Sequence, residues 1–165
     1  MEKSRSGARL IIVCGLPGSG KTTLAKALET DLHAVRFSAD DWMDALSINL
    51  WNEKMRARIE ALQWEFAKQL LAQDLVVIVE WGTWGRSERD KLRLEARTLG
   101  AAVELHYLEA PVDVLFARIR ERRVEEPPIQ RDDLLRWIEQ FQLPTVEEMA
   151  LFDVFTLRSP TEGEN

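Results

Sequence analysis

"VCGLPGSGKTTLAKAL", residues 13–28, is the stretch that decides the fold of this chain. Within it, residues 15–22 fit the pattern G-x-x-x-x-G-K-[ST], in which a glycine-rich loop cradles phosphate groups. The pattern follows a short apolar run, residues 9–14, and opens a segment of good helix formers, residues 21–31. This is the strand–loop–helix context that a phosphate-binding loop needs. We therefore expect residues 15–22 to form a P-loop that binds a nucleoside triphosphate.

Each type of residue in the pattern has a physical task in phosphate binding. Glycines let the backbone turn tightly and point its N–H groups at phosphate oxygens, and the following helix adds the positive end of its dipole. Lys21 is expected to reach the β- and γ-phosphates, and the Thr22 hydroxyl to ligate Mg²⁺. Thr23 fits packing or capping better than ligation. The expected contacts of ATP and Mg²⁺ are Gly15, Pro17, Gly18, Ser19, Gly20, Lys21, Thr22 and Thr23.

Length and composition indicate one ordinary globular domain. The 165 residues are 45% hydrophobic and 30% charged, and no apolar run approaches the roughly 20 residues of a membrane-spanning helix. The single cysteine, Cys14, cannot form an internal disulfide, so we expect a cytoplasmic protein without a membrane partner. The net charge of −6 argues against a nucleic-acid partner, because such proteins usually carry a basic face.

The apolar runs alternate with helical patterns, which is typical of a parallel α/β sheet. A basic arm (residues 1–8) and a polar tail (158–165), both expected to be disordered, flank one domain at 9–157. The expected strands are 9–14, 34–38, 74–82, 101–110 and 153–157, and the expected helices are 21–31, one beginning at 42, 51–73, 87–100, 111–123 and 131–141.

Carboxylates follow two of the expected strands and should therefore meet at the carboxyl edge of the sheet, beside the P-loop. Phosphoryl transfer to an alcohol needs a group that accepts the hydroxyl proton, and Asp40 or Asp41 could serve while the other caps the next helix. Glu80 ends the most apolar strand. It could hold Mg²⁺ through water, bind an acceptor hydroxyl, or form an ion pair with a nearby arginine.

Aromatic residues gather on the expected acceptor side of the sheet edge. Trp42, Trp81 and Trp84 follow the second and third strands, and with Asp41 and Arg86 they are our candidate contacts of the acceptor. The remaining tryptophans lie on helical patterns and are expected in the core; they are Trp51, Trp64 and Trp137.

An arginine-rich segment, residues 118–131, has the character of a lid over the phosphates, because two prolines interrupt its helix. Arg118 and Arg122 are four residues apart and share a helix face, where two guanidinium groups can clamp a transferring phosphoryl group. Arg120 and Arg123 fit a solvated face better.

Four motifs together, "GLPGSGKTT", "FSADDW", "VVIVEWG" and "FARIRERR", resemble those of small bacterial P-loop kinases. This group includes zeta-toxin-like kinases, chloramphenicol phosphotransferase, gluconate kinase and the kinase domain of phage-type polynucleotide kinase. The likeness spans residues 9–157. It implies a five-stranded parallel sheet of nucleoside-kinase type, order 2-3-1-4-5, flanked by helices, with the lid over ATP. It also implies Asp40 as the base, Arg118 and Arg122 over the phosphates, and an acidic residue at Glu80.

One departure bears on the acceptor. Polynucleotide kinases have a phosphate-gripping arginine three residues after the catalytic aspartate, where this chain has Met43. We therefore expect an ATP-dependent kinase acting on a hydroxyl of a small, partly apolar molecule. The alternatives are a 5′-hydroxyl polynucleotide kinase, a zeta-like kinase of a nucleotide sugar, and a nucleotide-dependent ATPase or switch that binds a protein. The sequence names neither the acceptor nor the oligomeric state.

Overall fold

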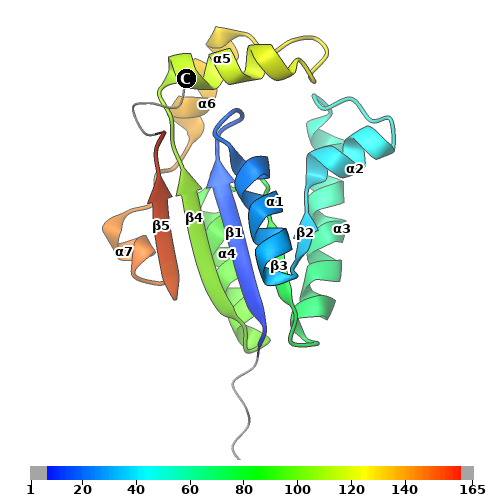
Figure 1. Ribbon diagram of the computed structural model, residues 1–165, viewed down its shortest axis with the longest axis vertical. Helices are drawn as coiled ribbons and strands as arrows, with labels where there is room; N and C mark the ends of the chain where they lie inside the picture. Colours follow the sequence, from blue (N-terminus) through cyan, green and yellow to red (C-terminus); the bar gives the residue numbers. More distant parts are fainter. Residues whose placement is uncertain (1–6, 161–165) are drawn as a thin grey trace, which may run out of the picture.

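A five-stranded, all-parallel sheet forms the centre of the protein in a computed structural model that describes residues 7–160. The strand order is β2-β3-β1-β4-β5, which confirms the predicted order (Figure 1). The P-loop strand β1 lies in the middle, with Ile11 beside Ile78 of β3 and Glu104 of β4. The strands are β1 (Arg9–Gly15), β2 (Val35–Phe37), β3 (Val76–Val79), β4 (Ala102–Leu108) and β5 (Val154–Arg158).

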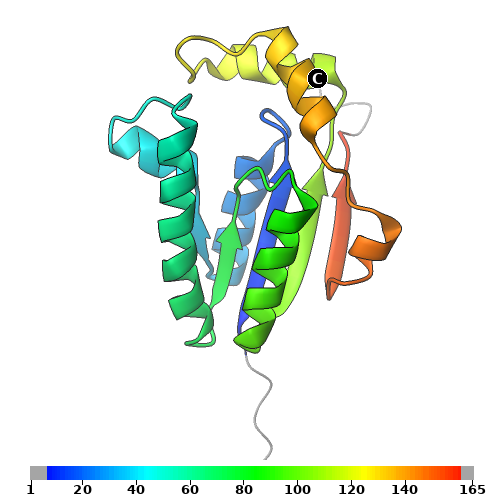
Figure 2. The ribbon, with the colours of Figure 1, turned by 180° about the vertical axis from the view of Figure 1, so that it is seen from behind.

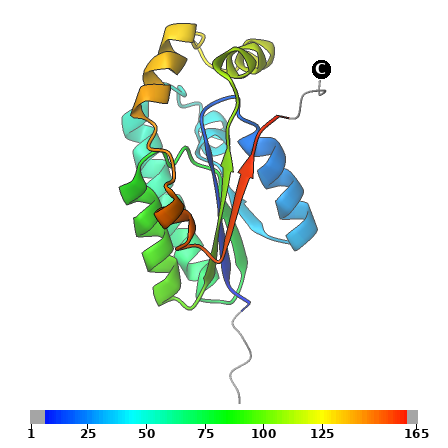
Figure 3. The ribbon, with the colours of Figure 1, turned by 90° about the vertical axis from the view of Figure 1, so that its left-hand side faces the viewer.

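Helices cover both faces of this sheet and its carboxyl edge. The helix α1 packs on one face, whereas α3 and α4 lie side by side on the other (Figures 1 and 2). The pair α5 and α6 crosses over the end at which the strands finish, as the side view also shows (Figure 3). The helices are α1 (Lys21–Leu32), α2 (Ala39–Ala45), α3 (Glu53–Leu71), α4 (Arg86–Thr98), α5 (Val112–Arg122), α6 (Arg131–Gln140) and α7 (Val146–Met149).

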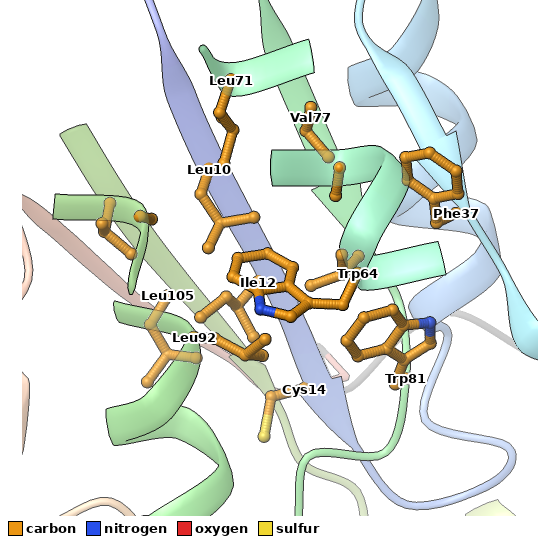
Figure 4. Close-up of a cluster of buried hydrophobic side chains, with 14 of the residues drawn as sticks. Leu10, Ile12, Cys14, Phe37, Trp64, Leu71, Val77, Trp81, Leu92 and Leu105 are labelled. Atoms are coloured by element: carbon orange, nitrogen blue, oxygen red, sulfur yellow. The ribbon is translucent and has the colours of Figure 1, made fainter. Parts of the chain in front are cut away.

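The core is built around β1, whose side chains alternate between the two helical layers. Leu10, Ile12 and Cys14 face α3 and α4, where Trp64 and Trp81 pack edge to face at a centroid distance of 6.4 Å (Figure 4). Residues of the opposite parity face α1 and form a second, smaller cluster. Burial on both faces explains why residues 10–14 are continuously apolar.

A buried ion pair ties the loop after β3 to the carboxyl-terminal part of the chain. Arg89 of α4 donates from Nε to Glu148 Oε1 at 2.6 Å and from Nη2 to Oε2 at 3.0 Å, and both side chains are at most 1% exposed. The guanidinium also donates to the carbonyls of Thr83, Trp84 and Gln142. Arg89 therefore fixes the β3–α4 loop with α7 and the chain after α6.

The structure differs from the sequence-based expectations at some element ends. The helix α2 begins at Ala39, and the Ser38 hydroxyl caps it by accepting from the Asp41 N–H, so neither aspartate is the cap. Ala8 is buried and its carbonyl accepts from the Ala102 N–H, whereas Arg158 belongs to β5. Ala8 and Arg158, which we expected in the arm and the tail, therefore pack with the sheet. The rest of the expected arm and tail, 1–6 and 161–165, lies outside the described residues. Among the described helices, none is long and apolar enough to cross a membrane.

Candidate active site

The P-loop runs from β1 into α1 at the carboxyl edge of the sheet. Gly18 and Gly20 have φ angles of 80° and 96°, in the left-handed region that favours glycine. A Cβ on Gly18 would lie 2.7 Å from the Leu115 carbonyl oxygen, so α5 packs directly on the loop. The Ser19 side chain is buried, and its hydroxyl has no hydrogen-bond partner in the described structure. A buried, unpartnered hydroxyl beside turned backbone fits a loop that holds phosphate oxygens.

Lys21 is the point at which the predicted catalytic groups meet. Its ammonium donates to the Leu16 carbonyl at 3.0 Å. Burial lowers the pKa of Lys21 to about 8, while the charges of Asp40 and Glu80 oppose this shift and that of Arg122 adds to it. These groups come from α1, α2, the end of β3 and α5, so the fold brings together four residues that are up to about a hundred positions apart in the sequence.

Thr22 and Glu80 form the candidate metal-binding pair. The Thr22 hydroxyl donates to Glu80 Oε1 at 2.9 Å. Burial raises the pKa of Glu80, opposed by the hydrogen bond from Thr22 and the charge of Arg36, whose Nη1 lies 3.3 Å from Oε2. Of the alternatives for Glu80, the ion pair with an arginine is present, and the same carboxylate accepts from Thr22, while its role toward Mg²⁺ stays a prediction. The described residues contain no group of three or more potential metal-ligating side chains. Thr22 and Glu80 nevertheless suit Mg²⁺, which usually takes one or two protein oxygens and completes its shell with phosphates and water.

The two aspartates of α2 have different partners. Asp40 forms an ion pair with Arg56 of α3, which also donates to the Leu50 carbonyl at 2.9 Å. Asp41 instead pairs with Arg36 at 2.7 Å, on the β2 side. Of the two carboxylates, it is Asp40 whose charge acts on Lys21. Sequence reasoning missed Arg56, and nothing in its surroundings distinguished it from the other charged residues of α3.

The segment expected to form the lid, residues 118–131, contacts the P-loop through Arg118. Arg118 Nη1 donates to the Gly18 carbonyl at 3.2 Å. Arg122 donates to Glu125 within the lid at 2.7 Å. Of the arginines that we assigned to solvent, Arg123 donates to a carbonyl of its own helix and Arg120 lies over the ring of Phe116.

The far end of the lid contacts the loop between α2 and α3. Asn49 donates from Nδ2 to the Glu126 carbonyl at 2.8 Å, and Trp51 donates from Nε1 to the Pro127 carbonyl at 2.6 Å. These two hydrogen bonds join the lid to the element that follows Asp40. The P-loop, α2 and the lid are thereby linked into one arch of chain above the sheet edge (Figure 1).

Two of the three tryptophans expected on the acceptor side, Trp42 and Trp81, have partners within the protein. Trp81 is 7% exposed and donates to Gln63, and Trp42 packs on Phe37 and Phe66 along a groove on the outer side of α3. Their place in the acceptor site therefore stays a prediction.

The third tryptophan of the expected set, Trp84, begins a series of packed indole rings. Trp84 contacts Trp137 at 5.8 Å between centroids, and Trp137 contacts Trp51 at 5.9 Å. Trp51 and Trp137, which we assigned to the core, pack on the small apolar cluster of α5 and α6. Trp64 is in the core, as expected. Arg86 pairs with Asp90 of its own helix at 3.0 Å.

Comparison with known proteins supports the assignment of the P-loop. The AAA_33 family, described as an AAA domain, matches residues 10–144. A "nucleotide-binding protein" of Syntrophotalea carbinolica is 31% identical over 134 residues, which are 81% of this chain and 42% of that protein. The chain thus spans less than half the length of this curated relative.

Solved structures share the fold over nearly the whole chain. A gluconokinase from Sinorhizobium meliloti is 22% identical to this chain, with a TM-score of 0.64. The match covers 96% of this chain and 86% of the gluconokinase chain. Chaetomium thermophilum Kti12, solved with ADP-AlF3, is also 22% identical, with a TM-score of 0.70 and coverage of 94% and 91%. At these identities the structures establish a P-loop kinase-like fold.

Proposed function

The chain belongs to the AAA_33 family of AAA domains, and we propose that it is an ATP-dependent kinase that transfers the γ-phosphoryl group to a hydroxyl of a small molecule. One observation carries this proposal: the charges of Asp40, Glu80 and Arg122 all act on the half-buried P-loop lysine, Lys21. Together they provide a cation for the phosphates, a carboxylate for the acceptor proton, an acid beside the metal and a second cation for the transferring group.

In this proposal Mg-ATP binds to the P-loop. Backbone N–H groups of residues 15–23 and the Ser19 hydroxyl would hold the phosphates, with Lys21 exchanging the Leu16 carbonyl for phosphate oxygens. Thr22 and Glu80 would hold Mg²⁺, which when bound neutralises charge on the β- and γ-phosphates. Arg118 and Arg122 would leave the Gly18 carbonyl and Glu125 for the transferring group. That exchange gives each arginine a more strongly charged acceptor.

The proposed transfer is a displacement at phosphorus. The acceptor oxygen forms a bond to the γ-phosphorus, the bond from that phosphorus to the β–γ bridging oxygen breaks, and ADP leaves with the electron pair. The hydroxyl proton passes to the carboxylate of Asp40. Arg56 is the group that orients this carboxylate, because it is already paired with Asp40 and held by the Leu50 carbonyl.

Three features support a small acceptor over a nucleic acid. The lid is hydrogen-bonded to the α2–α3 loop through Asn49 and Trp51, which restricts the space beside Asp40. Met43, which replaces a phosphate-gripping arginine, is fully buried in the core. The net charge of −6 opposes the approach of a polyanion.

The proposal covers the domain as one unit, with residues 9–157 as the kinase domain and 118–131 as its lid. It also assigns the protein to a reducing compartment such as the cytoplasm, since Cys14 is a buried free thiol. The activity of the whole protein is part of the same proposal, because the matched relative is longer than this chain.

The test is a search for the phosphorylated product. The protein is incubated with Mg-ATP and a panel of sugars, nucleosides, amino alcohols and 5′-hydroxyl oligonucleotides, and products are identified by mass. We expect one phosphate to be gained by a small-molecule member. Phosphorylation of the oligonucleotide, with binding that weakens steeply with salt, would make the protein a polynucleotide kinase instead. ATP consumption that no acceptor stimulates would favour an ATPase or switch.

A further inference from the structure

Residues 49–51, between α2 and α3, hold the lid by its backbone. Asn49 donates from Nδ2 to the Glu126 carbonyl at 2.8 Å, and Trp51 donates from Nε1 to the Pro127 carbonyl at 2.6 Å. Pro127 and the proline after it have no N–H, so this part of the lid offers carbonyl groups that need donors from elsewhere in the chain. The side chains of Asn49 and Trp51 supply two such donors.

The same three residues hold the guanidinium that is paired with the proposed base. The Leu50 carbonyl accepts from Arg56 Nη2 at 2.9 Å, while Nη1 of the same guanidinium pairs with Asp40. A planar guanidinium that is held by two acceptors has a defined orientation, and it loses one of its anchors when either acceptor moves. The orientation of the Asp40 carboxylate therefore depends on where residues 49–51 lie.

Packing makes residues 49–51 a bridge between two apolar clusters. Leu50 packs against the main core on the sheet, whereas Trp51 packs on the cluster of α5 and α6. Trp51 contacts Trp137 of α6 at 5.9 Å between ring centroids. Because close-packed side chains transmit displacement, two adjacent residues anchored on different clusters couple the position of one cluster to that of the other.

The opposite end of the lid lies on the P-loop. Arg118 donates to the Gly18 carbonyl at 3.2 Å, and a Cβ on Gly18 would lie 2.7 Å from the Leu115 carbonyl oxygen of α5. From there the chain passes over the sheet edge to the α2–α3 loop (Figures 1 and 2). One segment therefore contacts the proposed phosphate site at one end and residues 49–51 at the other.

We propose that Asn49 and Trp51 are positioning residues of the transfer reaction, and that they make the orientation of Asp40 depend on docking of the lid. Docking engages both donors and fixes the Leu50 carbonyl, which in turn holds Arg56 against Asp40. An undocked lid leaves Arg56 with one anchor fewer, so the base is poorly oriented while the site is open to water. The arrangement favours transfer to a bound acceptor over transfer to water.

The inference rests on the proposed kinase function, but hydrogen exchange tests the coupling without phosphoryl transfer. Mass spectrometry of the full chain with Mg²⁺ and AMPPNP follows exchange in peptides that span the lid. Asn49→Asp keeps the Oδ1 atom that accepts from the Trp51 N–H and removes the donor to the lid. Trp51→Phe keeps a ring against Trp137 and removes the Nε1–H donor.

A third variant, Arg56→Met, reaches the lid through residues 49–51 alone. The hydrogen bonds and ion pairs of Arg56 within the described residues are to Asp40 and Leu50, and none is to the lid. The matched control is Arg58→Met, which removes an exposed guanidinium of the same helix that has no ion-pair partner among residues 7–160.

We expect Asn49→Asp and Trp51→Phe each to raise the opening equilibrium of the lid by about 2- to 5-fold, the effect of one solvent-accessible hydrogen bond. Arg56→Met should raise it by a similar factor, because coupling between two parts of a protein is reciprocal. Arg58→Met should leave it as in wild type.

Turnover then separates a positioning role from a structural one. With Mg-ATP and the acceptor that the product search identifies, Trp51→Phe should lower kcat by about 2- to 5-fold and leave ATP affinity unchanged. In the Arg56→Met background the same substitution should lower kcat by a factor close to one, because Asp40 is then no longer held through Leu50. A lid that acts as a cover alone would give the same factor in both backgrounds.

Either of two results would overturn the inference. The first is that Arg56→Met leaves exchange of the lid the same as in Arg58→Met, and the second is that Trp51→Phe slows transfer equally with and without Arg56. If exchange shows the coupling and no member of the panel is phosphorylated, the coupling stands and the kinase proposal fails. If a member is phosphorylated and exchange shows no coupling, the kinase proposal stands without these positioning residues.

Discussion

Replacing Glu148 by glutamine tests the buried ion pair that holds the β3–α4 loop. The variant preserves the size of the side chain but leaves the Arg89 guanidinium, which is 0% exposed, without its anion. Both short hydrogen bonds, at 2.6 and 3.0 Å, lose their charged acceptor. Breaking a buried pair in this way costs about 3–5 kcal/mol. For a chain of this size that lowers Tm by about 6–20 °C.

Urea unfolding followed by circular dichroism measures the effect, and an unchanged slope with denaturant shows that stability itself has changed. The matched control is Glu65→Gln, which removes the exposed partner of Lys68 on α3 and should cost less than about 1 kcal/mol. If Glu148→Gln fails to fold, the double variant Arg89→Leu/Glu148→Leu should restore folding, because no charge then remains buried. A loss under about 1 kcal/mol for Glu148→Gln would refute the assigned role.

Three further predictions concern the site. Lys21→Ala should weaken ATP binding by about a hundredfold, because the P-loop cation is lost, and should retain the far-ultraviolet circular dichroism spectrum of wild type. An unchanged ATP affinity, measured by calorimetry, would contradict the P-loop assignment. Arg118→Ala should lower turnover more than ATP affinity, and the reverse pattern would make Arg118 a binding residue only. Burial raises the pKa of Glu60 from 4.5 in the unfolded chain to about 7 in the folded protein. The protonated carboxyl therefore contributes fully to the free energy of unfolding below pH 4.5, and this contribution is lost as the pH rises to 7. Urea titrations should show that the free energy of unfolding falls by at most about 3 kcal/mol between pH 4.5 and 7, and Glu60→Gln should lack this fall. An equal dependence of stability on pH in wild type and Glu60→Gln would mean that Glu60 is not desolvated.

The sheet and the P-loop could be predicted because local sequence determines them. Residues 10–14 are apolar on both faces, as a central parallel strand requires, and the glycine–lysine pattern fixes the loop and the start of the helix after it. The strand order came from the resemblance to small P-loop kinases and is confirmed. The spacing of Arg118 and Arg122 likewise predicted a segment over the P-loop, where Arg118 contacts Gly18.

The acceptor side could not be predicted because it depends on side-chain direction and on contacts between distant segments. Trp81 directly follows a strand, yet its indole points inward to Gln63, whereas Trp84, three residues later, packs on Trp137 of α6. Trp51 and Trp137 have helical spacing and suggested the core. Their place is set by the docking of the lid on the α2–α3 loop, and no local pattern encodes that docking.

The ion pairs of the site could not be predicted from the sequence either. Asp40 and Asp41 are adjacent, and only the positions of Arg56 and Arg36 separate their surroundings. Spacing alone left the choice of base open for this reason. The Ser38 cap was missed because Ser38 precedes two aspartates that are equally good caps in principle.

The most direct test of the kinase proposal compares turnover and ATP affinity in Asp40→Asn. Wild type, Asp40→Asn and the exposed control Asp44→Asn, which lies on the same helix, are assayed with Mg-ATP and the acceptor that the product search identifies. We predict that Asp40→Asn binds ATP as wild type does but transfers phosphate on the order of a hundredfold more slowly, the usual worth of a general base. Asp44→Asn should match wild type. Full phosphoryl transfer by Asp40→Asn would contradict the assignment of the base and, with it, the proposed mechanism.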